Sequence, residues 1–437
     1  MAEFLPIIMF KQRSDDDQRI EPGGDNTPRS WFLQGKELIQ RSHALQAGLL
    51  EELKTQRRNE SLPYLFDVSL VPGDTSKTRR TAVAALFDVN TSEEAPRVIA
   101  MRGSENLIVQ AHDEADVHRM ASNVGDMERN VAGISCVKEI GAFKPEVDLA
   151  SDDGEYKVKL VDYKDADKNR ACERAFEEIL DGMGLAYKRT QYAAALVIYR
   201  LKVSASEANA VLDGMMGESI FSIQPMPRYR MTLDGLDDNY GLPEPTLPEE
   251  GAEYPSLGIL DSGIEPIEHL APWLAGERWS PYPEEEQDHG HGTFVAGVAQ
   301  YGDQLEGTDW VGGLPSWIVD ANVFPNEKLF PAGVPEDEVI SNVEEALALL
   351  HDKAPVWNLS ISGPSPVKAN DFSDFAKALD ELQDKYDVLI CKTAGNTLAP
   401  FHGKDKERLF SGADSVRALT VGSAAQEKGP VVRTEVV

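Results

Sequence analysis

The sequence predicts a two-domain protein, with an α+β N-terminal domain followed by an α/β domain built on a parallel sheet. The chain has 437 residues, which is enough for two hydrophobic cores. An acidic, proline-rich stretch separates its halves and has the composition of a linker. Beyond this stretch, apolar runs typical of strands alternate with helical stretches, as in parallel sheets. We therefore expect an N-terminal domain at 1–233, a linker at 234–255 and a second domain at 256–437.

The N-terminal half carries helix and strand patterns but no motif that indicates chemistry. Apolar residues on a helical period predict a helix over 31–58. Two strand–helix–strand passages follow, and their expected segments are 106–110, 113–123 and 133–137, then 195–199, 206–212 and 220–224. Neither a glycine-rich phosphate loop nor a metal-ligand spacing occurs in this half. We expect a folded domain with a regulatory or partner-binding role.

Charge and cysteine content restrict the class of protein. Acidic residues outnumber basic ones 74 to 43, for a formal charge of −31. A nucleic-acid or anionic-membrane surface needs clustered Lys and Arg, so we expect neither partner.

The three cysteines, Cys136, Cys172 and Cys391, are too scattered for a disulfide framework and suit a reducing compartment. With no apolar run long enough to span a bilayer and no basic start typical of a signal peptide, the sequence predicts a cytoplasmic protein.

Two motifs in the second half combine an acid with a histidine. Ser256–Gly263 is an apolar strand that ends in Asp261 and then turns through a glycine. An acid at the carboxyl end of a parallel strand points into the crevice where α/β proteins bind ligands. In the stretch 288–297, Asp-His-Gly-His-Gly-Thr-Phe-Val-Ala-Gly, His291 stands at the start of a helix rich in small residues. A histidine held at a helix entry can serve as a general base.

Two further motifs are strands that run into small polar residues. Val356–Gly363 ends in Ser360, Ile361, Ser362 and Gly363, and a peptide could pair with such a strand by β-addition. Val388–Asn396 is an apolar strand that delivers a side-chain amide, Asn396, through Ala394 and Gly395. A fixed amide of this kind can donate a hydrogen bond to a developing oxyanion. Each motif alone is weak, because such turns are common at strand ends.

Taken together and in order, the four motifs resemble the subtilisin-like (S8) serine peptidases over about residues 255–437. Asp-Ser-Gly, His-Gly-Thr-x-Val-Ala-Gly, the substrate strand and Ala-Gly-Asn occur in the order of that family. Asp261 and His291 are 30 residues apart, close to the separation of about 30 in subtilisin. The resemblance implies a subtilisin-like parallel sheet flanked by helices.

The resemblance also implies roles for the motif residues. His291 would take a proton from a serine nucleophile, and Asp261 would hold and stabilise the imidazole. Asn396 would line the oxyanion hole. Ser360, Ile361, Ser362, Gly363, Ala394 and Gly395 would bind the substrate main chain. The implied activity is endopeptidase hydrolysis of protein or peptide substrates through an acyl-enzyme, without a cofactor.

The chain departs from the family at the nucleophile. The family carries its serine in a Gly-Thr-Ser segment, which the spacing from Asn396 would place at about position 460. No Gly-Thr-Ser occurs in the sequence, and Ser411, Ser415 and Ser423 do not fit that position. We therefore expect the peptidase domain to lack its C-terminal part, the nucleophile to lie beyond Val437, and the chain as given to be inactive. The alternative is a binding or scaffold protein on a catalytically dead subtilisin fold.

Other chemistry is less well supported. A metal site could in principle be formed by His289, His291, Asp261 and Asp288. His289 and His291 lie at a helix entry, however, where His289 suits a local hydrogen bond better. Many subtilisin-like enzymes bind structural calcium, although nothing in this sequence locates such a site.

Residues 195–225 resemble a subtilisin prodomain faintly. We hypothesise that the N-terminal half restrains the peptidase, itself or with a regulatory partner.

Overall fold

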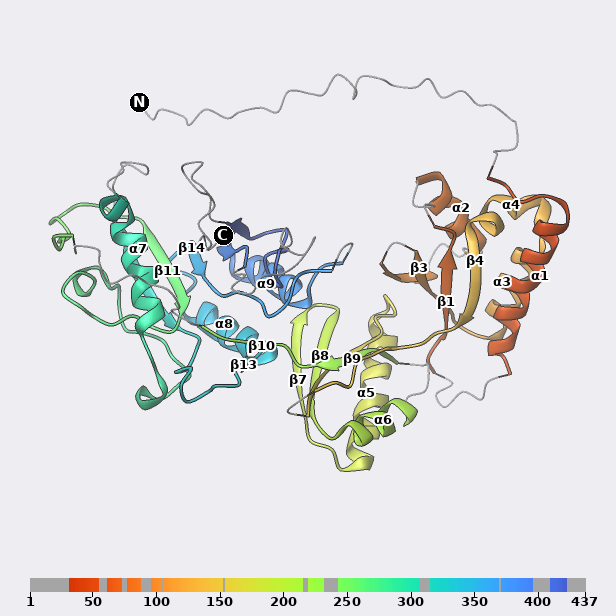
Figure 1. The fold of residues 1–437 in the computed structure, drawn as a ribbon, viewed down its shortest axis with the longest axis horizontal. Coiled ribbons are helices and arrows are strands. Elements are labelled where there is room, and N and C mark those ends of the chain that lie inside the picture. Colours follow the sequence, from red (N-terminus) through yellow and green to blue (C-terminus); the bar gives the residue numbers. More distant parts are fainter. Residues whose placement is uncertain are drawn as a thin grey trace, which may run out of the picture.

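The computed structural model describes residues 31–54, 61–72, 77–87, 96–103, 105–151, 154–214, 219–231, 243–306, 315–368, 371–395 and 409–422. These residues form three units that lie in a row along the long axis of the molecule (Figure 1). Each unit is built on its own sheet. Among the described residues, none of the helices has the length and apolar character that crossing a bilayer requires.

The first unit is a four-stranded antiparallel sheet, in the order β2-β3-β1-β4, covered by helices. Its strands are β1 (Tyr64–Leu70), β2 (Val98–Arg102), β3 (Asn106–Ala111) and β4 (Val137–Ala142). Its helices are α1 (Gly35–Glu52), α2 (Lys77–Phe87), α3 (Glu114–Gly125) and α4 (Met127–Cys136). The helix expected over 31–58 is α1, which begins only at Gly35 and ends at Glu52, and buried leucines on one side of it, Leu45 and Leu49, enter the core of this unit.

One predicted strand of this unit is wrong. Residues 133–137 were expected as a strand, but 133–136 form the last turn of α4 and β4 begins only at Val137. A Cβ on Gly133 would lie 2.7 Å from the carbonyl oxygen of Ala82, so the glycine allows α4 to pack closely on α2. This close helix packing outweighs the strand preference of the local sequence, which tertiary contacts commonly override.

The second unit is a five-stranded sheet in the order β5-β9-β6-β8-β7, with α5 (Ala166–Met183) and α6 (Ala205–Gly214). Its strands are β5 (Glu146–Val147), β6 (Glu155–Leu160), β7 (Tyr187–Ala193), β8 (Leu196–Lys202) and β9 (Ile220–Pro225). β8, α6 and β9 correspond to the second predicted strand–helix–strand passage. Side chains along β6 alternate between the two faces of the sheet. Tyr156 and Val158 enter the core beneath α5, whereas Lys157 and Lys159 face the third unit.

The third unit has the predicted parallel sheet. All its strand pairs are parallel, and the order is β12-β11-β14-β15-β16. The strands are β11 (Ser256–Asp261), β12 (Trp317–Asn322), β14 (Val356–Leu359), β15 (Leu389–Thr393) and β16 (Leu419–Val421). The helices are α7 (Gly290–Glu306), α8 (Glu336–Leu350) and α9 (Asp374–Tyr386), with short 3₁₀ turns η2 (Ala271–Trp273) and η3 (Glu284–Glu286). α7 belongs to the hydrophobic core on one side of this sheet, and α8 and α9 belong to the core on the other side.

The second unit docks on α8 and α9 of the third. Tyr192, Leu196 and Ile198 of the second sheet belong to the same core cluster as residues of α8 and α9, including Val343 and Phe375. A further connection is the short antiparallel pair of β10 (Arg228–Tyr229) with β13 (Val334–Pro335). The sheet of the second unit therefore covers a helical face of the third (Figure 1).

The docking surface also contains a buried ion cluster. Lys157 lies 2.6 Å from a carboxylate oxygen of Glu336 and 2.9 Å from one of Asp374, and Lys159 lies 2.9 Å from the other oxygen of Asp374. Burial alone would lower the pKa of Lys157, but the carboxylates of Asp374 and Glu336 hold it above its ordinary value. Glu336 and Asp374 stand in the first turns of α8 and α9, where the helix dipole stabilises negative charge. Paired charges thus join the two units.

Part of the expected linker lies on the third unit. Trp273 donates a hydrogen bond to the carbonyl oxygen of Thr246 at 2.9 Å, and the Thr246 amide donates to Tyr301 at 3.2 Å. Residues 243–255 therefore run along the surface of the parallel-sheet unit. Residues 234–242 of the expected linker lie outside the described residues.

Candidate active site

Asp261 and His291 lie in contact at the carboxyl end of the parallel sheet. Asp261 is the last residue of β11 and is fully buried, and His291 stands in the first turn of α7. His291 Nδ1 lies 2.7 Å from Asp261 Oδ1. Because a carboxylate only accepts hydrogen bonds, Nδ1 must be the donor and carry the proton. The neutral imidazole then has its free lone pair on Nε2, the arrangement that a general base requires.

The turn after β11 and the start of α7 hold this pair by backbone contact. The Asp261 carboxylate accepts the amide proton of Ser262 at 2.8 Å, and the Ser262 hydroxyl accepts the amide proton of Gly292 at 3.2 Å. A Cβ on Gly292 would lie 2.2 Å from the carbonyl oxygen of Gly263. Only glycine at 292 therefore lets the helix start approach the turn closely enough for His291 to reach Asp261.

We expect Gly292→Ala to destabilise the protein by about 1–3 kcal/mol, because the added methyl group overlaps backbone that cannot move like a side chain. The matched control is Gly297→Ala in the same helix, where a Cβ would meet no atom within 4 Å. There the higher helix propensity of alanine should leave stability equal or slightly greater. Urea unfolding of both variants measures the difference, and equal midpoints would contradict this account of the site.

His289 has a different, local set of partners. Its Nε2 lies 2.8 Å from Arg278 Nη1, and its Nδ1 lies 3.0 Å from Glu265 Oε2. An arginine can only donate, so Nε2 accepts and Nδ1–H donates to Glu265. Arg278 also binds Asp320 at 2.6 Å. His289 thus supports the loop beside the site, as the sequence suggests. The described residues contain no group of three or more His, Cys, Asp or Glu side chains that could hold a metal ion.

The residues expected to bind substrate end two neighbouring strands of the same sheet. β14 runs into Ser360–Gly363 and β15 runs into Ala394–Gly395, and both strands are parallel to β11. Their carboxyl ends therefore share one edge of the sheet with Asp261. Ser360 donates a hydrogen bond to the Asn358 side chain at 2.9 Å. Asn396, expected to line an oxyanion hole, lies outside the described residues.

Segment 409–412 packs against both of these strand ends. The Phe410 amide donates to the carbonyl oxygen of Ala394 at 3.0 Å, and a Cβ on Gly395, whose φ is +126°, would lie 2.6 Å from the Phe410 ring. On the other side, a Cβ on Gly363 would lie 2.7 Å from the carbonyl oxygen of Ser411. Glycine at 363 and 395 thus allows close packing that makes one continuous rim.

A buried lysine that the sequence analysis overlooked supports this rim. Lys392, the last but one residue of β15, has no exposed surface, and its Nζ donates to the carbonyl oxygens of Ile361 and Thr393. Burial lowers the pKa of Lys392 to about 7, and the charge of Asp414 opposes this only in part. The signal in the sequence is a lysine inside an otherwise apolar strand, Val388-Leu-Ile-Cys-Lys-Thr.

Lys392 should make stability depend on pH. Below pH 7 the amine is protonated in both the folded and the unfolded chain, so burial of the charge destabilises the fold in full. Between pH 7 and the ordinary value of 10.5 the unfolded chain binds more protons, so the free energy of unfolding rises with pH, by at most about 5 kcal/mol. Lys392→Met should therefore gain stability relative to the wild type at pH 6 more than at pH 9. Urea unfolding at both pH values, with the exposed Lys202→Met as control, measures this; a gain independent of pH would contradict it.

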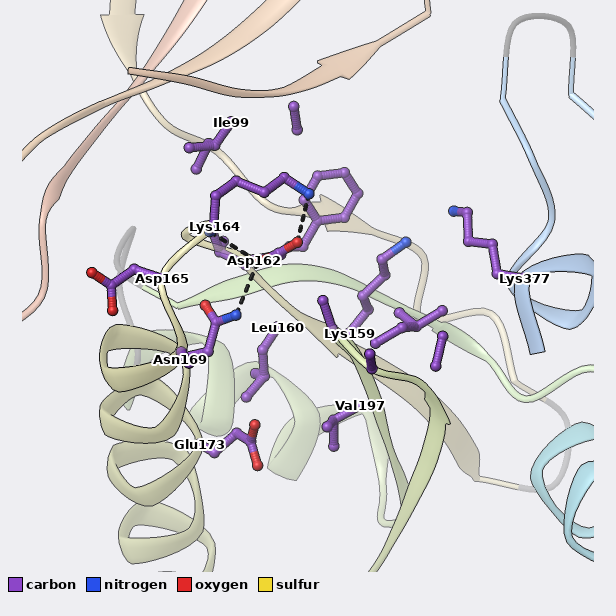
Figure 2. Close-up of a pocket in the computed structure, with 18 of the residues that line it drawn as sticks. Ile99, Lys159, Leu160, Asp162, Lys164, Asp165, Asn169, Glu173, Val197 and Lys377 are labelled. Carbon is purple, nitrogen blue, oxygen red and sulfur yellow. Dashed lines mark hydrogen bonds and ion pairs between the residues drawn. The ribbon is translucent and has the colours of Figure 1, made fainter. Parts of the chain in front are cut away.

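A cavity of about 890 Å³ lies elsewhere, between β2 and β3 of the first unit and β6, α5 and β8 of the second. Figure 2 shows Asp162 on the wall of this cavity, bound to Lys164 and Asn169. Asp162 accepts hydrogen bonds from Lys164 at 2.6 Å and from Asn169 at 2.9 Å. None of the residues expected at the active site lines this cavity. It has no part in the candidate chemistry.

Comparison with known proteins agrees with this geometry. Residues 253–434 match the model of the subtilase family, Peptidase_S8. Residues 253–434 form a subtilase domain. The match begins just before β11 and includes every residue discussed for the site. A search of curated proteins found no match to the chain. The expected fold class is confirmed, since the subtilase domain has a parallel five-stranded sheet flanked by helices.

Proposed function

We propose that the subtilase domain is a serine endopeptidase in which His291 is the general base and Asp261 its orienting carboxylate. The family match places the domain among subtilisin-like peptidases in general. The observation that supports the finer assignment is the 2.7 Å contact of His291 Nδ1 with buried Asp261. This contact leaves Nε2 free to take the proton of a serine hydroxyl and later to give it to the leaving amine. Asp261 stabilises the imidazolium that forms between these steps.

The proposal assigns the remaining groups to binding. Segments 360–363 and 394–395 pair with the main chain of an extended peptide, and the Asn396 amide donates to the oxyanion. No Gly-Thr-Ser segment occurs among the 437 residues, and the proposal assigns the nucleophile to none of them. The same observation favours the second candidate function, a binding protein on a subtilisin fold without catalysis.

Activity labelling tests the proposal. The reading frame that encodes the chain is followed downstream, and its product is treated with a fluorophosphonate probe. A Gly-Thr-Ser segment about 25 residues after Val437 and labelling at its serine support the endopeptidase. A stop codon directly after Val437, with a purified chain that is not labelled, supports the binding protein.

We also propose that the second unit restrains the peptidase. Its sheet covers α8 and α9, its lysines pair with Glu336 and Asp374, and β10 pairs with β13 immediately before α8. A peptidase in the cytoplasm, the compartment that three free cysteines favour, requires such restraint. Release of this unit would expose the helical face and the edge of β13.

A further inference from the structure

The first and second units repeat one topology. In chain order the first unit is β1-α2-β2-β3-α3-α4-β4 and the second is β6-α5-β7-β8-α6-β9, so both have the β-α-β-β-α-β arrangement, with two helices in the second helical position of the first unit. The strand order is β2-β3-β1-β4 in the first sheet and, leaving out the added β5, β7-β8-β6-β9 in the second. Every one of these strand pairs is antiparallel. Each unit therefore has a sheet face opposite to its helices.

This sheet face docks on the next unit in both cases. In the second unit the face carries Ile198, which belongs to the core cluster of α8 and α9 in the subtilase domain. In the first unit it carries Leu65 and Ile108, which belong to the core cluster of the second unit. A hydrogen bond joins the same surfaces, since the Gln110 side chain donates to the carbonyl oxygen of Tyr163 at 3.1 Å. The first unit thus docks on the second as the second docks on the subtilase domain.

The segment after the last strand also repeats its role. β5 follows the first unit and pairs with β9 of the second, where the Asp148 amide donates to the carbonyl oxygen of Ile223 at 2.9 Å. β10 follows the second unit and pairs with β13, where the Glu336 amide donates to the carbonyl oxygen of Pro227 at 2.9 Å. Each unit is therefore attached to the next one along the chain by a sheet face and by an added strand.

Arg102 of the first unit reaches the contact between the second unit and the subtilase domain. Its guanidinium carbon lies 5.1 Å from the centroid of the Phe221 ring, and Lys159 Nζ lies 5.2 Å from the centroid of the same ring. Lys159 in turn binds Asp374 of α9 at 2.9 Å. Because an aromatic face attracts cations, Phe221 brings Arg102 into one cluster with the lysine that docks on α9.

Glu146 of β5 makes a second connection between the same parts. Arg102 Nε lies 3.6 Å from one carboxylate oxygen of Glu146, and Lys368 of the subtilase domain lies 3.9 Å from the other. Arg102 also pairs with Asp67 at 3.3 Å, and only 14% of its side chain is exposed. Since the pair with Lys368 is largely exposed and contributes little, the connection depends mainly on Arg102.

We infer that the first unit is a second restraining module, which stabilises the second unit on the subtilase domain, and that Arg102 couples the two contacts. The inference rests on the proposed restraint by the second unit and gives a role to the unit before it. Release of the peptidase then requires two contacts to open instead of one. Because such coupling is reciprocal, loosening either contact weakens the other.

Hydrogen exchange of the full chain tests the inference through one amide in each contact. The Asp148 amide reports the docking of the first unit, and the Glu336 amide reports that of the second. Arg102→Ala should speed exchange at Asp148 by about tenfold or more, because β5 loses a bond to a charged group. At Glu336 we expect about fivefold, the lower end of the usual coupling between sites. The amides of α1 should keep their protection, which shows that the first unit stays folded.

Two further variants show whether the coupling is specific. Arg129→Ala, which removes an exposed arginine from α4 of the same unit, should change neither amide. In a Phe221→Leu background, Arg102→Ala should still speed exchange at Asp148 but should change that at Glu336 by about twofold or less. Unchanged exchange at Glu336 in Arg102→Ala, or an equal effect with and without the Phe221 ring, would overturn the coupling.

The readout separates the inference from the proposed function. Exchange reports docking and not catalysis, so it needs no nucleophile. An active peptidase whose second unit is still docked would refute the proposed restraint alone. Exchange at Glu336 that does not respond to Arg102→Ala would refute the coupling alone.

Discussion

Replacing His291 by alanine should lower kcat by about 10⁶-fold in a chain that carries the nucleophilic serine. His291 Nε2 is the group proposed to take the serine proton, and the loss of the corresponding histidine in subtilisin has an effect of this size. Asp261→Asn should lower kcat by about 10⁴-fold, because an amide can hold the imidazole in the wrong tautomer. Peptide hydrolysis under single-turnover conditions measures both effects, and fluorophosphonate labelling should fall with them.

His289→Ala is the matched control for this prediction. It removes a histidine two positions away whose ring is bound by Arg278 and Glu265. We expect at most a modest loss, through the loop that this histidine supports. A loss from His289→Ala as large as that from His291→Ala would show that the assignment of the base is wrong.

Replacing Lys157 by alanine should destabilise the contact between the second unit and the subtilase domain by about 3–5 kcal/mol. The change leaves the buried Glu336 without its cation and removes one of the lysine partners of Asp374, and an unpaired buried charge is costly. Hydrogen exchange of the amides in α8 and in β7 measures the opening of this contact. Both elements should exchange faster in the variant, while the helices of the first unit should be unaffected.

Two further variants show whether the effect is specific. Lys202→Ala removes an exposed lysine from the same sheet and should change exchange by less than the equivalent of about 1 kcal/mol. Lys157→Met combined with Glu336→Gln removes both charges of the fully buried pair and should restore much of the stability, since Asp374 keeps Lys159 as its partner. If Lys157→Ala behaved like Lys202→Ala, the ion cluster would contribute nothing to docking.

Local sequence determined the fold class of the second half and the identity of its central pair. β11 ends at Asp261 and α7 begins beside His291, where Asp-Ser-Gly and His-Gly-Thr predict them. Such motifs can be read directly because each one combines a strand end or helix start with the small residues that its own backbone contact requires. Gly292 illustrates this, since its packing on Gly263 is demanded by the same motif that contains His291.

Tertiary structure alone decided the features that depend on distant partners. The last turn of α4 replaced an expected strand because Gly133 packs on α2. Lys157 is the partner of Glu336 from 179 positions away, and Tyr229 reaches Ser411 across 182. The spacing of apolar residues describes only the surroundings that a residue has within its own helix or strand. The burial of a charged or phenolic side chain depends instead on which surfaces of distant segments come into contact. The contact of His291 with Asp261 was therefore predictable from sequence, but the burial of Tyr229 and the ion cluster beside it were not.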